Sequence, residues 1–205
     1  MINNITIDIE TFDTKPSAVI LSIGAFAFDI KNLSETQAAI IMTAQNSESA
    51  QYSEQSFYGL VDTFDQLMRC RSVSRETQQW WYKKGAGARA ALVGERETLE
   101  TQLLNLSSWV AQHRDARIFF RGTDFDGIIL EHAYRMCGME CPWNYNGKRD
   151  VRTYIDAMSH SARGYLKDHQ PCFAMVKHNS LHDAMNDAEQ MAVAYQLNGQ
   201  AVANV

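Results

Sequence analysis

The sequence predicts an α/β or α+β domain in which a mixed β-sheet is flanked by α-helices. Strand-like patterns are concentrated in the first third of the 205 residues, and helical patterns follow, interrupted by one further strand. Hydrophobic residues make up 45% of the chain and charged residues 21%, as in an ordinary globular domain. No shift in composition marks a boundary, so we expect a single domain over residues 1–205.

The predicted strands open the chain. Residues 4–10 (NITIDIE) alternate apolar and polar side chains, as a half-buried strand does. Residues 18–30 (AVILSIGAFAFDI) form a longer, mostly apolar strand, and Pro16 fits the connection between the two. Two further strands are predicted, AAIIMTA (38–44) and FYGLV (57–61). The polar stretch 45–55 between them is predicted to be a loop.

From residue 63 the period becomes helical. The clearest case is the stretch 95–113, in which four apolar residues recur at helical spacing: Leu99, Leu103, Leu106 and Val110. Further helices are predicted over 63–69, 74–84, 150–160 and 180–197. The short apolar run ARIFF (116–120) is predicted to be a buried strand, followed by a loop and a helix that Gly138 ends.

Net charge and termini limit the functional classes. A net charge of −5 argues against a protein covered in positive charge for tight, non-specific duplex binding. A short basic path could still come from Gly147–Arg152 and Arg121, the alternative being scattered solvated charges. The first residues show no basic region or cleavage site, and the longest apolar run is too short to span a bilayer, so a cytoplasmic protein is expected.

The four cysteines match no zinc motif and suggest no disulfide framework. Cys137 and Cys141 lie four residues apart with His132 nearby, which leaves two interpretations, a metal site or reduced thiols in the core.

The first strand carries a candidate metal-binding pair. Side chains alternate between the two faces of a strand, so Ile5, Ile7 and Ile9 share one face, and Asp8 and Glu10 share the other. Two carboxylates on one face repel each other unless a cation lies between them. The alternative for an isolated D-x-E is a solvent-facing edge.

A second candidate is the segment GTDFDGIIL, which follows the strand ARIFF. A strand, a Gly-containing turn and a helix place Asp124 or Asp126 near the edge of the sheet. The alternative is helix capping, because Asp is favoured in the first turn of a helix.

The third candidate is KHNSLHDAMNDAEQMA, in which a His is followed five residues later by an Asp twice: His178 with Asp183, and His182 with Asp187. If Ser180 is the N-cap, Asp183 falls at the third helical position, and the alternative is a capped helix with a polar face. His182 and Asp187 both lie within the helix and point about 140° apart. His178 precedes the helix and is free of that constraint.

Taken together, the three segments favour metal-assisted chemistry. Four carboxylates can hold two divalent ions, and Mg²⁺ prefers hard oxygen ligands. A nearby His is suited to accept a proton at neutral pH. The sequence has no P-loop, nucleophile elbow or zinc signature that would compete with this interpretation.

The three ordered motifs resemble those of the DEDDh family of 3′–5′ exonucleases. The motif D-x-E-T is present as DIET, GTDFD matches the second motif, and HNSLHDA matches H-x-A-L-x-D-A except that Ser180 replaces Ala. The resemblance implies roles for five residues: Asp8, Glu10, Asp126 and Asp183 as metal ligands, and His178 as general base.

The resemblance covers most of the chain and is weakest between about residues 30 and 70. SIGAFAFD, ETQQWWYKKG and RDVRTY are similar to the phage and bacterial branch that includes the DexA exonuclease and related 3′–5′ exoribonucleases. The resemblance implies a ribonuclease H-like fold, two Mg²⁺ or Mn²⁺ ions, and stepwise release of nucleoside monophosphates from a single-stranded 3′ end.

Under this resemblance Thr11 and Phe12, just past the first motif, are predicted to contact the terminal nucleotide, with core packing as the alternative for Phe12. Trp80 and Trp81 point about 100° apart on a helix, so at most one is expected to face substrate. Core or subunit-interface packing is favoured for them, which leaves a homodimer open.

The alternative function is a catalytically silent nucleic-acid-binding module on the same fold. Degenerate members are expected to lack motif residues, whereas this chain keeps all five. An endonuclease of the same fold is a third hypothesis, which the His-containing motif disfavours. The choice between RNA and DNA stays open, because it depends on a contact at the 2′ position.

Overall fold

The computed structural model describes residues 2–46 and 54–203, and a five-stranded mixed sheet runs through its centre. From one edge to the other the strands are β3 (Ser56–Leu60), β2 (Ile20–Phe28), β1 (Asn4–Thr11), β4 (Arg117–Phe120) and β5 (Lys148–Asp150). The first three strands pair antiparallel, whereas β4 runs parallel to both β1 and β5. The predicted mixed sheet is confirmed.

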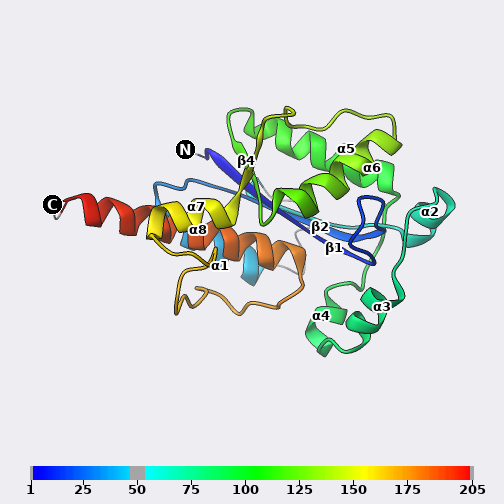
Figure 1. Cartoon of the computed structure of the whole chain (residues 1–205), viewed down its shortest axis with the longest axis horizontal. Coiled ribbons are helices and arrows are strands. Elements are labelled where there is room, and N and C mark those ends of the chain that lie inside the picture. Colours follow the sequence, from blue (N-terminus) through cyan, green and yellow to red (C-terminus); the bar gives the residue numbers. More distant parts are fainter. Residues whose placement is uncertain (1, 47–53, 204–205) are drawn as a thin grey trace.

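Helices cover both faces of the sheet (Figure 1). One face is covered by α5 (Leu99–Val110) and α6 (Ile128–Met136), and the other by α1 (Leu33–Gln45), α7 (Val151–Ser159) and α8 (Ser180–Ala203). Three short helices connect β3 to α5: α2 (Thr63–Met68), α3 (Arg75–Tyr82) and α4 (Ala86–Ala90). Among the described residues, none of the helices has the length and apolar character needed to cross a bilayer.

The alternation predicted for the first strand is confirmed. Ile5, Ile7 and Ile9 are buried in the hydrophobic cluster that includes residues of α5 and α6. The opposite face of β1 meets α8, where the Thr6 hydroxyl donates a hydrogen bond of 2.8 Å to the Ala184 carbonyl. Asp8 shares this second face, so the strand presents its carboxylates toward α8.

The start of α8 lies very close to the sheet at Gly24 of β2. A Cβ atom at this position would overlap with the backbone of Ser180 and Leu181 in the first turn of α8. Gly24 is paired with Asp8 in the antiparallel register. The missing side chain therefore lets the start of α8 lie directly over the strand pair that carries Asp8.

Replacing Gly24 by Ala is expected to lower the melting temperature, because the new methyl group must displace backbone rather than a flexible side chain. Overpacking of this kind costs about 1–3 kcal/mol or more. Thermal unfolding followed by circular dichroism measures the effect. The matched control is Gly199→Ala in α8, where a Cβ would meet nothing within 4 Å and helix propensity favours Ala. Equal melting temperatures for the two variants would contradict the role assigned to Gly24.

One predicted strand is wrong. Residues 38–44 (AAIIMTA) lie in α1, which begins after Asn32, whose side chain accepts a hydrogen bond from the Glu35 amide. Its apolar residues pack against α8 and β2 rather than pairing as a strand, and Ile40 is fully buried. Of the predicted loop 45–55, Gln45 ends α1, and residues 47–53 lie outside the described residues.

The remaining predicted elements are present with small shifts of their ends, whereas α4 and β5 were not predicted. The segment FYGLV (57–61) forms most of β3, and ARIFF (116–120) contains β4. Strand β5 has the sequence KRD, and its parallel pairing with β4 defines it rather than any apolar pattern.

Candidate active site

The three segments singled out in the sequence meet at one cavity. Its volume is about 540 Å³, and the four predicted carboxylates and the predicted base all line it: Asp8, Glu10, Asp126, Asp183 and His178. Asp8 and Glu10 come from β1, and Asp126 comes from the turn after β4. His178 lies in the loop before α8, and Asp183 lies in the first turn of α8. The parallel pairing of β1 with β4 and the packing of α8 over β1 bring these segments together.

Asp126 lies in η2 (Thr123–Gly127), a single π-helical turn between β4 and α6. The turn is entered through Gly122, whose φ of 101° favours glycine. The Asp126 side chain is buried, and its Oδ1 atom accepts a hydrogen bond of 3.3 Å from the Ile9 amide of β1. Asp124 is exposed, so of the two aspartates left open by the sequence, Asp126 belongs to the cavity.

The start of α8 differs from the prediction in its cap. Asn179, not Ser180, accepts hydrogen bonds from the amides of the first turn, at 3.0 Å from Leu181 and 3.2 Å from His182. The Ser180 hydroxyl is used elsewhere, because it donates to the Ser22 hydroxyl of β2 at 3.0 Å. This bond ties the helix start to the sheet.

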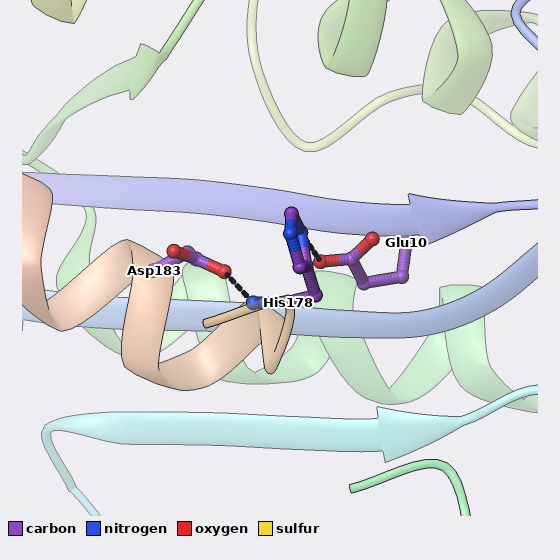
Figure 2. A group of neighbouring side chains, drawn as sticks. All are labelled: Glu10, His178 and Asp183. Carbon is purple, nitrogen blue, oxygen red and sulfur yellow. Dashed lines mark hydrogen bonds and ion pairs between the residues drawn. The ribbon is translucent and has the colours of Figure 1, made fainter. Parts of the chain in front are cut away.

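His178, Glu10 and Asp183 form the closest group in the site (Figure 2). The His178 amide donates a hydrogen bond of 2.9 Å to Asp183 Oδ2, and its ring Nδ1 lies 3.7 Å from Glu10 Oε1. The backbone of His178 is left-handed, with φ of 64°. One potential ligand atom from each of the three residues lies within 4.8 Å of the others. The 3.7 Å separation is longer than a hydrogen bond, so the ring faces the carboxylate without bonding to it.

Burial and the neighbouring carboxylates raise the pKa values of three acidic residues in the site, Asp8, Asp126 and Asp183. Burial is the largest cause for Asp8, whose pKa lies well above its usual value, and Asp126 and Asp183 raise it further. Burial also raises the pKa of Asp126, although the hydrogen bond from Ile9 opposes the shift. For Asp183, burial and the charge of Glu10 raise the pKa to about 7. Such a cluster of hard oxygen donors fits divalent cations, which would relieve the repulsion.

Two adjacent tryptophans of α3 flank the histidine. The ring centroids of Trp80 and Trp81 lie 4.7 Å and 6.1 Å from that of His178, both edge to face. Trp81 is buried, and its indole Nε1 donates a hydrogen bond of 3.0 Å to the Thr11 carbonyl at the end of β1. Lys84 Nζ lies 3.7 Å from the centre of the exposed Trp80 ring. Trp81 is therefore packed in the core, as the sequence favoured, and also contacts His178, whereas the exposed Trp80 contacts His178 from the surface.

Thr11 and Phe12 lie beside the cavity in different ways. Thr11 lines a second hollow of about 410 Å³ next to Trp80, and its buried hydroxyl donates a hydrogen bond of 2.7 Å to the Asp13 carbonyl. Phe12 packs against the small apolar cluster around Leu21 and Trp81. A contact of Thr11 or Phe12 with a terminal nucleotide stays a prediction.

The two residues of the second His–Asp pair lie in different surroundings, because Asp187 lines the cavity and His182 does not. His182 is buried, its Nδ1 accepts a hydrogen bond of 3.0 Å from the Val176 amide, and its ring packs edge to face on Phe173. Asp187 is buried at the back of the cavity and forms a salt bridge of 2.7 Å with Arg121. The sequence did not predict this ion pair. The signal available was Arg121 directly after a buried strand.

The predicted basic path is only partly present. Arg121 is committed to Asp187, and Lys148 Nζ lies 2.6 Å from Glu131 Oε1, away from the cavity. Arg152, at the start of α7, does line the cavity.

Comparison with known proteins gives the family. The sequence profile described as the 3′–5′ exoribonuclease Rv2179c-like domain matches residues 3–195. The chain belongs to the Rv2179c-like family. Among curated proteins, none matches the sequence significantly.

A solved structure matches the Rv2179c-like domain over most of its length. It is the nuclease domain of 3′hExo, a DEDDh family member bound to rAMP, with a TM-score of 0.57 and 13% identity. The match covers 94% of this chain and 90% of that chain. Together with the family membership, it confirms the DEDDh 3′–5′ exonuclease family and the ribonuclease H-like fold predicted from the ordered motifs.

Proposed function

We propose that this Rv2179c-like domain removes nucleoside 5′-monophosphates one at a time from the 3′ end of single-stranded nucleic acid, with the help of two divalent metal ions. The observation that carries the proposal is the convergence of Asp8, Glu10, Asp126 and Asp183 with His178 in one cavity. RNA is the favoured substrate, because the family to which the chain belongs is described as exoribonucleases.

The four carboxylates would hold Mg²⁺ or Mn²⁺. Their oxygens match the preference of both ions, and burial together with mutual repulsion raises the pKa values of Asp8, Asp126 and Asp183, a repulsion that cations would relieve. When bound, two ions would supply positive charge that acidifies the attacking water and stabilises the leaving oxygen.

His178 is the proposed general base. Its Nδ1 atom faces Glu10 across 3.7 Å, a gap in which a water held by the carboxylate could donate a proton to the ring. The oxygen of that water attacks the phosphorus of the last nucleotide, and the bond from phosphorus to the 3′ oxygen of the preceding nucleotide breaks. The 3′ oxygen takes up a proton from a solvent water and leaves as a hydroxyl, and the proton held by His178 is released to solvent. The products are a nucleoside 5′-monophosphate and a strand one nucleotide shorter.

Asp183 couples the proposed base to the carboxylate cluster. Its side chain accepts the hydrogen bond from the His178 amide and at the same time lines the cavity. The left-handed backbone at His178 turns the chain so that this bond and the contact with Glu10 form together. The carboxylate would thus position the histidine as well as bind metal.

The competing hypothesis is a nucleic-acid-binding module without catalysis. The arrangement of the site favours the enzyme, because all four carboxylates and the histidine are present and share the cavity. A module that only binds single strands has no need for buried carboxylates that raise one another's pKa values.

Hydrolysis of matched RNA and DNA strands tests the proposal. We expect 5′-labelled single-stranded RNA to give a ladder that shortens by single nucleotides with Mg²⁺ or Mn²⁺, and no product with a chelator. DNA of the same sequence is expected to be cut more slowly. Internal fragments would indicate an endonuclease, and binding without cleavage in either metal would favour the silent module.

A further inference from the structure

The acidic cluster lines the main cavity, and a second hollow of different character adjoins that cavity at Glu10. The second hollow is lined by Trp80, Trp81 and Phe125, and it shares Glu10, Ile9 and Phe125 with the main cavity. The main cavity continues past the carboxylates toward α7 and the loop before α8, where Arg152 and Tyr165 line it. A strand cut at its last phosphodiester must place one nucleoside on one side of the acidic cluster and the remaining strand on the other.

Tyr165 offers a supported aromatic surface in the wall of the main cavity. Its side chain is 51% exposed, and Arg121 lies over its ring with the guanidinium carbon 4.3 Å from the ring centre. Arg121 is fixed from two sides, because its Nε atom donates to Asp187 at 2.7 Å and its Nη1 atom to the Gly164 carbonyl at 2.7 Å. The ring thus rests on a held cation while much of its surface faces solvent.

Arg152 supplies a second positive charge beside Tyr165. It is exposed, its charge acts on the buried Asp187 carboxylate, and within the part of the chain that the structure describes its guanidinium has no hydrogen-bond or salt-bridge partner. Its aliphatic stem packs against Gly164, where an added Cβ would overlap with the stem. The guanidinium extends toward Gly122 at the entrance to the turn that carries Asp126. A free arginine next to a cluster of carboxylates is placed to pair with a phosphate.

The loop that carries Tyr165 is fixed by hydrogen bonds to α7. Gly164 has a φ of 69°, which favours glycine. Its amide and that of Arg163 donate to Asp156 Oδ1 of α7 at 2.8 Å and 3.1 Å. These bonds fix the ring relative to Arg152, which lies on the same helix as Asp156.

We propose that Tyr165 and Arg152 form the binding site for the nucleotide on the 5′ side of the bond that is cut. The Tyr165 ring stacks on the base of this nucleotide, and the Arg152 guanidinium pairs with its phosphate. Stacking on an aromatic ring combined with a nearby positive charge is a sequence-tolerant way to hold a single strand. The inference rests on the proposed function, because it takes the acidic cluster as the place of cleavage.

Two substrates of different length distinguish a loss of binding at this site from a loss of catalysis. The p-nitrophenyl ester of thymidine 5′-monophosphate has one nucleoside and nothing nucleotide-like beyond the bond that is cut, whereas a single-stranded RNA hexamer extends along the cavity. For Tyr165→Ala and for Arg152→Ala we expect KM for the hexamer to rise about tenfold, the effect of losing one stacked base or one phosphate contact. Hydrolysis of the ester should change less than twofold. Tyr165→Phe keeps the ring and should restore hexamer binding.

Matched controls are available on other surfaces. Tyr145 is 92% exposed and does not line the main cavity, and Arg114 is exposed on a different part of the molecule. Tyr145→Ala and Arg114→Ala change composition and charge in the same way and should leave both substrates unaffected. Equal losses on hexamer and ester, or an unchanged KM for the hexamer in both cavity variants, would overturn the proposal.

A binding measurement keeps this inference separate from the proposed function. Fluorescence anisotropy of a labelled RNA hexamer with Ca²⁺ in place of Mg²⁺ reports the site without cleavage. If the wild type hydrolyses neither substrate, the proposed function fails, and weaker binding by Tyr165→Ala and Arg152→Ala would still support the site. Unchanged binding in both variants would overturn it.

Discussion

Replacing Asp8 by Asn is expected to abolish metal-dependent hydrolysis, lowering kcat by about a thousandfold or more. Asn has nearly the same shape as Asp but removes one charged ligand from the centre of the cluster. The same change should raise the melting temperature of the metal-free protein. The Asp8 carboxylate is buried next to Asp126 and Asp183, which raises its pKa, so its charge opposes folding when no cation is bound. Turnover of labelled RNA and thermal unfolding in chelator measure the two effects.

The rise in melting temperature caused by Asp8→Asn should depend on pH in a defined direction. For a carboxyl group whose pKa is raised in the folded state, the stabilisation is complete below its unfolded pKa and is lost as pH rises through its folded pKa. For Asp8, whose pKa in the folded protein lies well above its usual value of 3.8, the stabilisation is lost as pH rises above that value. The difference in melting temperature between Asp8→Asn and the wild type should therefore grow from pH 4 to pH 7, and Mg²⁺ should diminish it at pH 7. The exposed Asp124→Asn is the control, and a similar gain in that variant would argue against a special role for the cluster.

Replacing His178 by Ala is expected to lower kcat by a factor of about 10² to 10⁴ while KM changes little, because the variant loses proton transfer and not substrate contacts. The ring is partly exposed in the cavity, so the melting temperature should stay close to that of the wild type. Stabilisation by added Mg²⁺ should persist, since the four carboxylates remain. Steady-state hydrolysis of the RNA hexamer measures kcat and KM.

His182→Ala provides the contrasting variant. It removes the acceptor for the Val176 amide and a ring packed on Phe173, so it should lower the free energy of unfolding by about 1–3 kcal/mol. Its kcat should fall much less than that of His178→Ala, because His182 does not line the cavity. Equal losses of kcat in two equally folded variants would mean that the first histidine is not the base.

The sequence predicted the carboxylates better than their surroundings. Asp8 and Glu10 could be assigned to one face because a strand alternates its side chains, and the β1 packing agrees. The ion pair between Arg121 and Asp187 could not be predicted, because its partners lie 66 residues apart and meet only through tertiary packing. The contacts of Trp80 and Trp81 with His178 depend in the same way on where α3 lies relative to the loop before α8.

The errors in the predicted fold have local physical causes. The run AAIIMTA was taken for a strand because it is short and apolar, although Asn32 followed by Glu35 is a usable helix-start signal. Strand β5 contains only charged residues, so no hydrophobic period could indicate it. Its existence depends on hydrogen bonds to β4, which neighbouring residues in the sequence do not determine.

The π-helical turn at Thr123–Gly127 is less regular than an α-helix, but it orients Asp126 for its role in the site. A π turn contains one residue more than an α-helical turn, and such turns are usually less stable than the α-helix into which they would relax. Loss of a single residue here would yield a more regular helix but rotate Asp126 by about 100° away from β1. The irregular turn therefore gives up some local helix stability and keeps the Asp126 carboxylate within hydrogen-bond distance of β1.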